Sequence, residues 1–93
     1  MDCVYILHSL HLDRFNVGYS SDLNSRLEYH KKSASDKFTA KANDWIVFLI
    51  IDCVSKEQGL QIERHIKNMK SKIYIQNLLK YPEMILKLKE KYG

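Results

Sequence analysis

The first apolar segment of the chain, residues 3–8, has the composition and the alternation of a β-strand. Most of its side chains are β-branched, aromatic or leucine. In an extended chain, Val4 and Ile6 fall on one face and Tyr5 and Leu7 on the other. The pattern therefore predicts a strand with side chains to bury on both faces.

A second strand is predicted over residues 15–19, close enough to the first for a hairpin connection. Its odd-numbered residues, from Phe15 to Tyr19, share one face, whereas Asn16 and Gly18 share the opposite one. A glycine inside a strand weakens it unless something approaches the backbone closely there.

Residues 20–22, Ser-Ser-Asp, are typical of a helix start, and the helix should run to about Lys32. Two leucines four residues apart form its apolar stripe. Arg26 and His30 have the same spacing and should stand together at the edge of the buried face.

Residues 33–44 are polar and rich in small side chains, which indicates a loop. Residues 45–53, WIVFLIIDC, are the most hydrophobic stretch and predict a third strand. Because apolar residues do not alternate with polar ones there, we expect both faces of this strand to be covered for most of its length.

A capping box at residues 55–58 predicts the start of another helix. Ile62, Ile66 and Met69 repeat at i, i+4 and i+7 and give this helix its buried stripe. Glu63 lies beside Ile66 around the helix, at the rim of the buried face.

The C-terminal part is predicted less sharply. Residues 73–79 fit a helix or an extended segment, and Pro82 suits the first turn of a last helix. The apolar side of that helix consists of Met84, Ile85, Leu88 and Tyr92. The order is β-β-α-β-α-α, with one further helix left open. We therefore expect a single α+β domain over residues 1–93, with a small three-stranded, mainly antiparallel sheet packed with three or more helices.

The composition, 45% hydrophobic and 28% charged, is that of a globular chain. No apolar run approaches the ~20 residues of a membrane span, and the N-terminus lacks a basic leader, so we expect neither a membrane segment nor a signal peptide. Cys3 and Cys53 lie in apolar strand-like segments without metal-ligand spacing. They are interpreted as reduced core thiols of a cytoplasmic protein.

Positive charge is concentrated in the C-terminal part. Residues 1–54 hold six Lys/Arg and seven Asp/Glu, whereas residues 55–93 hold nine Lys/Arg and four Asp/Glu. This asymmetry suggests an anionic partner, usually nucleic acid. On charge alone, a solvated lysine-rich helical surface explains it equally well. The side chains expected to form the basic surface are Arg64, Lys67, Lys70 and Lys72.

The order of these motifs resembles the GIY-YIG nuclease family. VYIL at residues 4–7, FNVGYSSDLNSRLEYH at 15–30, and Glu63 within GLQIERHIKNMKSK carry the resemblance. Phe38-Thr39 and Trp45 are similar to small single-domain members, which resemble the N-terminal domain of the excision-repair subunit UvrC. The resemblance covers nearly the whole chain.

Both signature motifs depart from the family pattern. Cys3-Val4-Tyr5 stands where the first motif has Gly-Ile-Tyr, at a position where the glycine varies among members. Asn16-Val17-Gly18 stands where Tyr-Ile-Gly is expected, so the second signature tyrosine is absent. Tyr19 is nearby, but on the opposite face of a regular strand from Asn16. The missing tyrosine bears on catalytic competence more than on the fold.

The resemblance implies hydrolysis of DNA phosphodiester bonds with Mg²⁺ or Mn²⁺, in repair or recombination. Glu63 would hold the metal, Arg26 the scissile phosphate, and Tyr5 would orient or deprotonate the attacking water. His30 would relay a proton or donate to phosphate, and Asn77 matches an active-site amide of many members. Substrate contacts are assigned to Asn16, Gly18, Arg64, Lys67, Lys70 and Lys72.

Each residue also has a structural interpretation. Tyr5 fits a core position, His30 a helix C-terminal cap, and Glu63 an i, i+4 ion pair with Lys67. Arg26 has the same spacing from Asp22. Three functions therefore stay open: an endonuclease, a catalytically impaired module of the same fold that binds nucleic acid or protein, and a helix-mediated interaction domain that uses residues 82–93. In the first two cases a protein partner could supply specificity.

Overall fold

The computed structural model describes residues 2–22 and 45–93. It contains three strands, β1 (Cys3–Ser9), β2 (Arg14–Ser20) and β3 (Ile46–Asp52). They form one antiparallel sheet in the order β2-β1-β3, with β1 in the centre. The three predicted strands and the α+β class are confirmed. The helix predicted to run to Lys32, with Arg26 and His30, and the loop predicted over residues 33–44 lie outside the described residues.

The β1–β2 hairpin turns through residues 10–13. Asp13 has φ of 50°, a left-handed conformation that aspartate tolerates better than most residues. The Ser9 hydroxyl accepts a hydrogen bond of 3.1 Å from the Leu12 amide. This turn fixes the pairing register, in which Tyr5 lies opposite Gly18.

Three helices follow the sheet: α2 (Lys56–Met69), α3 (Lys72–Lys80) and α4 (Pro82–Tyr92). The hydroxyls of Ser55 and Ser71 cap α2 and α3, each accepting from the amide three residues on. Lys70, with φ of 48°, ends α2 and redirects the chain. The ambiguous segment at residues 73–79 is therefore helical, and α4 begins at its proline as predicted.

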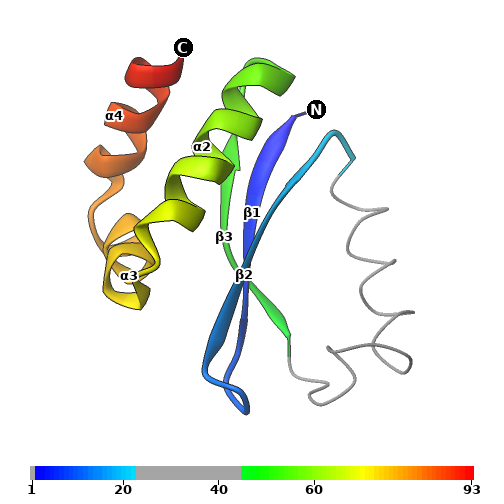
Figure 1. Cartoon of the computed structure of the whole chain (residues 1–93), viewed down its shortest axis with the longest axis vertical. Helices are drawn as coiled ribbons and strands as arrows, with labels where there is room; N and C mark the ends of the chain where they lie inside the picture. The colour runs from blue at the N-terminus through cyan, green and yellow to red at the C-terminus, as the bar shows by residue number, and fades with distance from the viewer. Residues whose placement is uncertain (1, 23–44) are drawn as a thin grey trace.

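The three described helices lie on one side of the sheet, with α2 against the strands and α4 packed against α2 and α3 (Figure 1). Side chains at alternate positions of β1 and β2 meet the apolar stripes of the helices there. The partly buried Met84, Ile85 and Tyr92 of α4 pack against this cluster, which confirms the predicted apolar side. The buried cluster consists of Val4, Ile6, Val17, Ile51, Cys53, Ile62, Ile66, Ile75, Leu78 and Leu88.

In the capping box of α2, the Gln58 side chain bonds to the amide of Val54, the residue before the N-cap, whereas the usual partner is the amide of the N-cap residue itself. The Gln58 side chain accepts from the Val54 amide at 2.8 Å and donates to the Lys89 carbonyl at 3.2 Å. One buried amide thus fixes the start of α2 and joins α2 to α4.

Two burial predictions are wrong. Within β3, Ile46, Val47 and Ile50 are 54%, 42% and 41% exposed, so the strand is not covered on both faces for most of its length. β3 lies at a sheet edge, where an apolar sequence does not guarantee cover. Met69 is 45% exposed because α2 ends there, so its buried stripe stops at Ile66.

The two cysteines, Cys3 and Cys53, are free and buried, in agreement with the interpretation as core thiols. Burial raises the pKa of both thiols, which keeps them protonated and poorly reactive. Within the described ranges, none of the helices has the length and apolar character needed to cross a membrane.

Candidate functional site

Tyr5 lies on the sheet face opposite the helices and is 2% exposed. Its ring crosses the neighbouring strand at Gly18. A Cβ atom at position 18 would stand 2.4 Å from the Tyr5 hydroxyl and 2.5 Å from Cζ. Glycine is therefore required because the phenol occupies the space of a side chain there. The structure thus provides the close approach that a glycine within a strand leads us to expect.

Asn16 shares this face of β2, two residues from Gly18, and is half-buried. The register is regular along the whole of β2, so alternation holds between Asn16 and Tyr19. This confirms that Tyr19 points to the opposite face from Asn16.

Tyr19 is held by two contacts on that opposite face. Its ring lies against Gly59 of α2, where an added Cβ would stand 2.6 Å from Cδ1. Its hydroxyl donates to the Asp2 carboxylate, which, with some burial, raises the pKa of Tyr19 to about 12. A phenol engaged and protonated in this way is a poor substitute for the missing signature tyrosine.

One side of α2 follows β2. Gly59, Glu63 and Lys67 are spaced four residues apart and therefore lie along one side of the helix. Gly59 contacts Tyr19 of β2, and Lys67 lines a groove beside Asn16 and Val17. Glu63, between them, must lie beside the same stretch of β2.

The Glu63 carboxylate is 20% exposed and stands 3.8 Å from the Lys67 ammonium. The ion pair anticipated from the i, i+4 spacing is thus present. Glu63 approaches β2 from the helix side, and the Tyr5 phenol covers Gly18 on the other side. The two groups therefore lie on the two sides of one edge strand.

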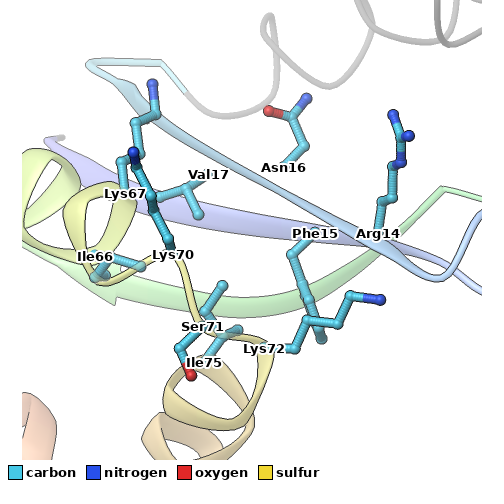
Figure 2. Close-up of a pocket in the computed structure, with 10 residues that line it drawn as sticks. All are labelled: Arg14, Phe15, Asn16, Val17, Ile66, Lys67, Lys70, Ser71, Lys72 and Ile75. Carbon is cyan, nitrogen blue, oxygen red and sulfur yellow. The ribbon is translucent and has the colours of Figure 1, made fainter.

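A groove of about 370 Å³ opens between β2, the end of α2 and the start of α3 (Figure 2). Its buried wall consists of side chains that belong to the hydrophobic core, and its exposed border is cationic. The lining residues are Arg14, Phe15, Asn16, Val17, Ile66, Lys67, Lys70, Ser71, Lys72 and Ile75.

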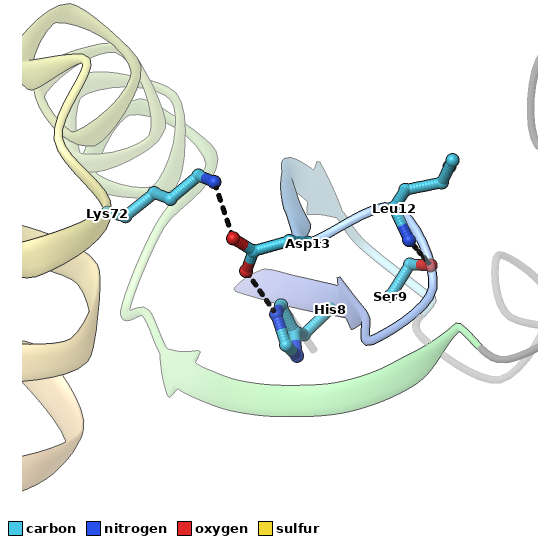
Figure 3. Close-up of polar contacts among 5 residues, drawn as sticks. All are labelled: His8, Ser9, Leu12, Asp13 and Lys72. Atoms are coloured by element: carbon cyan, nitrogen blue, oxygen red, sulfur yellow. Dashed lines mark hydrogen bonds and ion pairs between the residues drawn. The ribbon is translucent and has the colours of Figure 1, made fainter.

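A small polar network closes the hairpin end of this groove (Figure 3). Asp13 accepts from the Lys72 ammonium at 2.9 Å, and His8 Nε2 lies 3.7 Å from the same carboxylate. Its hydrogen bond with Lys72, and then the charge of that lysine, hold the pKa of Asp13 below its usual value. The network ties the β1–β2 turn to the first turn of α3.

Two predicted residues of the described ranges, Arg64 and Asn77, do not line the groove. Arg64 is exposed on α2 and does not line the groove. Asn77 is half-buried on α3, outside the groove lining, and its backbone carbonyl accepts from the Tyr81 amide. The structure thus brings together Asn16, Lys67, Lys70 and Lys72 of the predicted substrate contacts.

Arg14 and Phe15 line the groove but were not predicted as functional. In the sequence, Arg14 falls within the expected hairpin connection, and Phe15 is an ordinary apolar strand position. The start of β2 at Arg14 is fixed only by the turn. An arginine next to an apolar strand start was the available signal, and it is a weak one.

Mg²⁺ requires oxygen ligands in a near-octahedral arrangement. The described ranges contain no group of three His, Cys, Asp or Glu side chains placed to hold an ion. A single half-buried carboxylate such as Glu63 still fits Mg²⁺, which usually keeps several waters and takes further oxygens from a phosphate. The donor set therefore suits a metal completed by substrate and water.

Comparison with protein families yields one match. The family described as GIY-YIG catalytic domain matches residues 1–78, which include Tyr5, Asn16, Gly18, Glu63 and Asn77. No curated protein and no solved structure matches the chain.

Proposed function

The chain belongs to the GIY-YIG family, and on that premise we propose that it is a metal-dependent endonuclease that hydrolyses DNA phosphodiester bonds. The family identifies a nuclease-type domain. The choice of DNA, the metal dependence and a role in repair or recombination are part of the proposal.

The observation that carries the proposal is the arrangement around β2. A buried phenol lies against Gly18 on one side, and a half-buried carboxylate follows the same strand on the other. Both groups stand at positions that carry the family resemblance, Tyr5 and Gly18 on paired strands and Glu63 on the helix beside them. Their coincidence favours an active site.

Glu63 would hold the Mg²⁺ ion, which when bound would polarise the phosphate and neutralise charge on the leaving oxygen. Arg26, as implied by the family pattern, would hold the scissile phosphate through its fork of donors. Asn77 and His30 keep their predicted roles as an active-site amide and a proton relay.

Tyr5 has a hydroxyl that both donates and accepts, so it would orient the attacking water. Its burial gives that hydrogen bond a low-dielectric environment, in which it is stronger than in water. Asn16 would contribute a neutral amide at the position of the second signature tyrosine. An amide cannot take up a proton from water as a phenolate can, so we expect a slower reaction than with two tyrosines.

Asn16 also supports the alternative function, in which the same fold binds nucleic acid or a protein partner without cutting. The basic groove is compatible with either function. Magnesium-dependent turnover separates them.

The decisive experiment is nicking of supercoiled plasmid with and without Mg²⁺. We expect Glu63→Ala to lower the nicking rate at least about 100-fold, a loss typical of a missing metal ligand or transition-state contact. Glu90→Ala, which removes an exposed carboxylate on α4, is the matched control and should keep the parent rate. Circular dichroism should show both variants folded, because surface substitutions rarely cost much stability.

Equal nicking by the parent and Glu63→Ala would remove Glu63 from the mechanism. DNA binding without nicking by the parent protein, at every magnesium concentration, would establish the binding module instead.

A further inference from the structure

We propose that the groove beside β2 binds one unpaired nucleotide of the DNA substrate, with its base on the apolar wall and its phosphates on the cationic border. The proposal rests on the proposed function only in taking nucleic acid as the ligand. It requires no metal and no cleavage.

The wall of the groove is apolar because buried core side chains line its bottom. Val17, Ile66 and Ile75 are 8%, 1% and 7% exposed and contribute to both the core and the lining. Phe15 adds a half-buried ring, stacked on His8 with centroids 4.5 Å apart and edge-on to Phe48 at 5.0 Å. A rigidly supported aromatic ring beside aliphatic side chains is a surface on which a planar base can stack.

The border of the groove is cationic at both ends (Figure 2). Lys67 and Lys70 come from the end of α2, whereas Arg14 and Lys72 stand near the hairpin. Two carboxylates pair with this set, Glu63 with Lys67 and Asp13 with Lys72. Lys70 adds a further positive charge at the border, so lysines surround the apolar wall on the side of α2 and α3.

This combination selects among anionic ligands. A duplex presents phosphates outward but keeps the faces of its bases inside the stack, so it could use the border and not the wall. An unpaired nucleotide offers both a planar apolar face and a phosphate on either side. The volume of about 370 Å³ lies at the lower end of the range for small-molecule sites and suits a single nucleotide better than a longer segment.

The groove adjoins the proposed active site at Asn16, which lines the groove and shares a strand face with Gly18. A nucleotide held there would be a near neighbour of the nucleotide that is cut. The groove would therefore favour cleavage beside unpaired DNA.

Fluorescence anisotropy in EDTA tests the proposal without cleavage, using a labelled 12-nucleotide oligothymidylate and a mixed-sequence 12-base-pair duplex. We expect the single strand to bind more tightly. Lys67→Ala/Lys70→Ala should weaken its binding about tenfold and flatten the slope of log K against log salt by about 1.4, or about 0.7 for each phosphate that a lysine no longer neutralises. The matched control is Lys87→Ala/Lys91→Ala, which removes the same charge from α4 and should change both values far less.

Phe15→Leu separates the wall from the border. It retains an apolar side chain but removes the aromatic face, so we expect single-strand affinity to fall about tenfold with the salt slope unchanged. Should Phe15→Leu lower the melting temperature too far for titration, photocrosslinking of a 4-thiothymidine oligonucleotide to the parent protein replaces it. We then expect adducts at groove residues, Phe15 among them.

Equal binding of duplex and single strand, adducts confined to other surfaces, or equal competition by polyglutamate would each overturn the proposal. Glu63→Ala should bind the oligonucleotide at least as well as the parent. If Glu63→Ala loses nicking but still binds the oligonucleotide, the groove proposal stands. If the parent protein nicks DNA but does not prefer the single strand, the groove proposal is wrong and the proposed function is unaffected.

Discussion

The two edge strands of the sheet, β2 and β3, have the same length and the same central partner, yet their side chains differ in kind. The register makes the comparison direct, because every residue of β1 from Cys3 to His8 has a partner on each side. Tyr5 lies between Gly18 of β2 and Ile50 of β3. On the β2 side the partner leaves space that the phenol fills; on the β3 side it is a 41% exposed isoleucine.

The row of Leu7 repeats the contrast, with Asn16 on β2 and Val47 on β3. On this face, β2 carries Gly18 and Asn16 at two successive positions. Their counterparts in β3, Ile50 and Val47, are apolar although both are exposed. On the β2 side the space is filled by the Tyr5 phenol, and a polar amide follows it on the same face. The contrast supports the proposal that the active site lies at the β2 edge.

The largest effect should come from filling the space at position 18. Gly18→Ala introduces a Cβ atom 2.4 Å from the Tyr5 hydroxyl, and Tyr5 is too deeply buried to swing aside freely. We expect nicking to fall at least about 100-fold, because an active-site group displaced by an ångström can cost that much. Overpacking should also lower the free energy of unfolding by about 1–3 kcal/mol.

The control for Gly18→Ala is Ile50→Ala, on the other side of the same tyrosine. It should lower stability while leaving the nicking rate per folded molecule near that of the parent. Thermal melts and plasmid nicking measure the two effects separately. If Ile50→Ala slowed nicking as much as Gly18→Ala, the proposal that the β2 edge and not the β3 edge takes part in catalysis would be wrong.

The elements of this fold were largely predictable because their signals are local. The serine that caps α2, the proline at the start of α4 and the alternation in β1 act over a few residues. Alternation alone also placed Tyr5 apart from Val4 and Ile6. The exposure of β3 was not predictable, since an apolar run does not say whether its strand is central or at an edge.

The site was predictable only where the family pattern or helix periodicity reached. The position of Glu63 at the rim of α2 followed from periodicity, and the ion pair with Lys67 from spacing. The role of Gly18 required the pairing register, and that of Arg14 required the exact end of the hairpin turn. Both depend on contacts between strands, which no single segment encodes.

A smaller effect, of opposite sign, is expected from restoring the family tyrosine. Asn16→Tyr adds a phenol on the face that carries the Tyr5 side chain. We expect nicking to rise about tenfold, which is less than the roughly 100-fold or more that one acid–base group usually contributes. Val47→Tyr adds the same group in the same row of β3 and should leave the rate unchanged. Single-turnover nicking at fixed magnesium measures both.

No gain from Asn16→Tyr would mean that the asparagine, or a water beside it, already serves the reaction. An equal gain from Val47→Tyr would mean that the added phenol acts through DNA affinity and not through its position.

The smallest effect concerns the row of Val4, with Tyr19 on β2 and Ile51 on β3. The hydrogen bond from Tyr19 to Asp2 raises the pKa of this phenol from about 10 to about 12. Between these pH values an unfolded chain loses the proton while the folded chain keeps it. Since the unfolded state then binds fewer protons, this contribution to stability is complete below about pH 10 and disappears as the pH rises through about 12.

Tyr19→Phe should therefore lower the melting temperature slightly at pH 8, and the gap to the parent should close towards pH 12. Tyr81→Phe, which changes an exposed tyrosine at the junction of α3 and α4, should give no such closing gap. Melting curves at intervals from pH 8 to pH 12 measure the difference. Because Tyr19 faces the helices and not Asn16, nicking at pH 8 should be unchanged; a large loss would instead make Tyr19 the second phenol of the site, and β2 would then act through both of its faces.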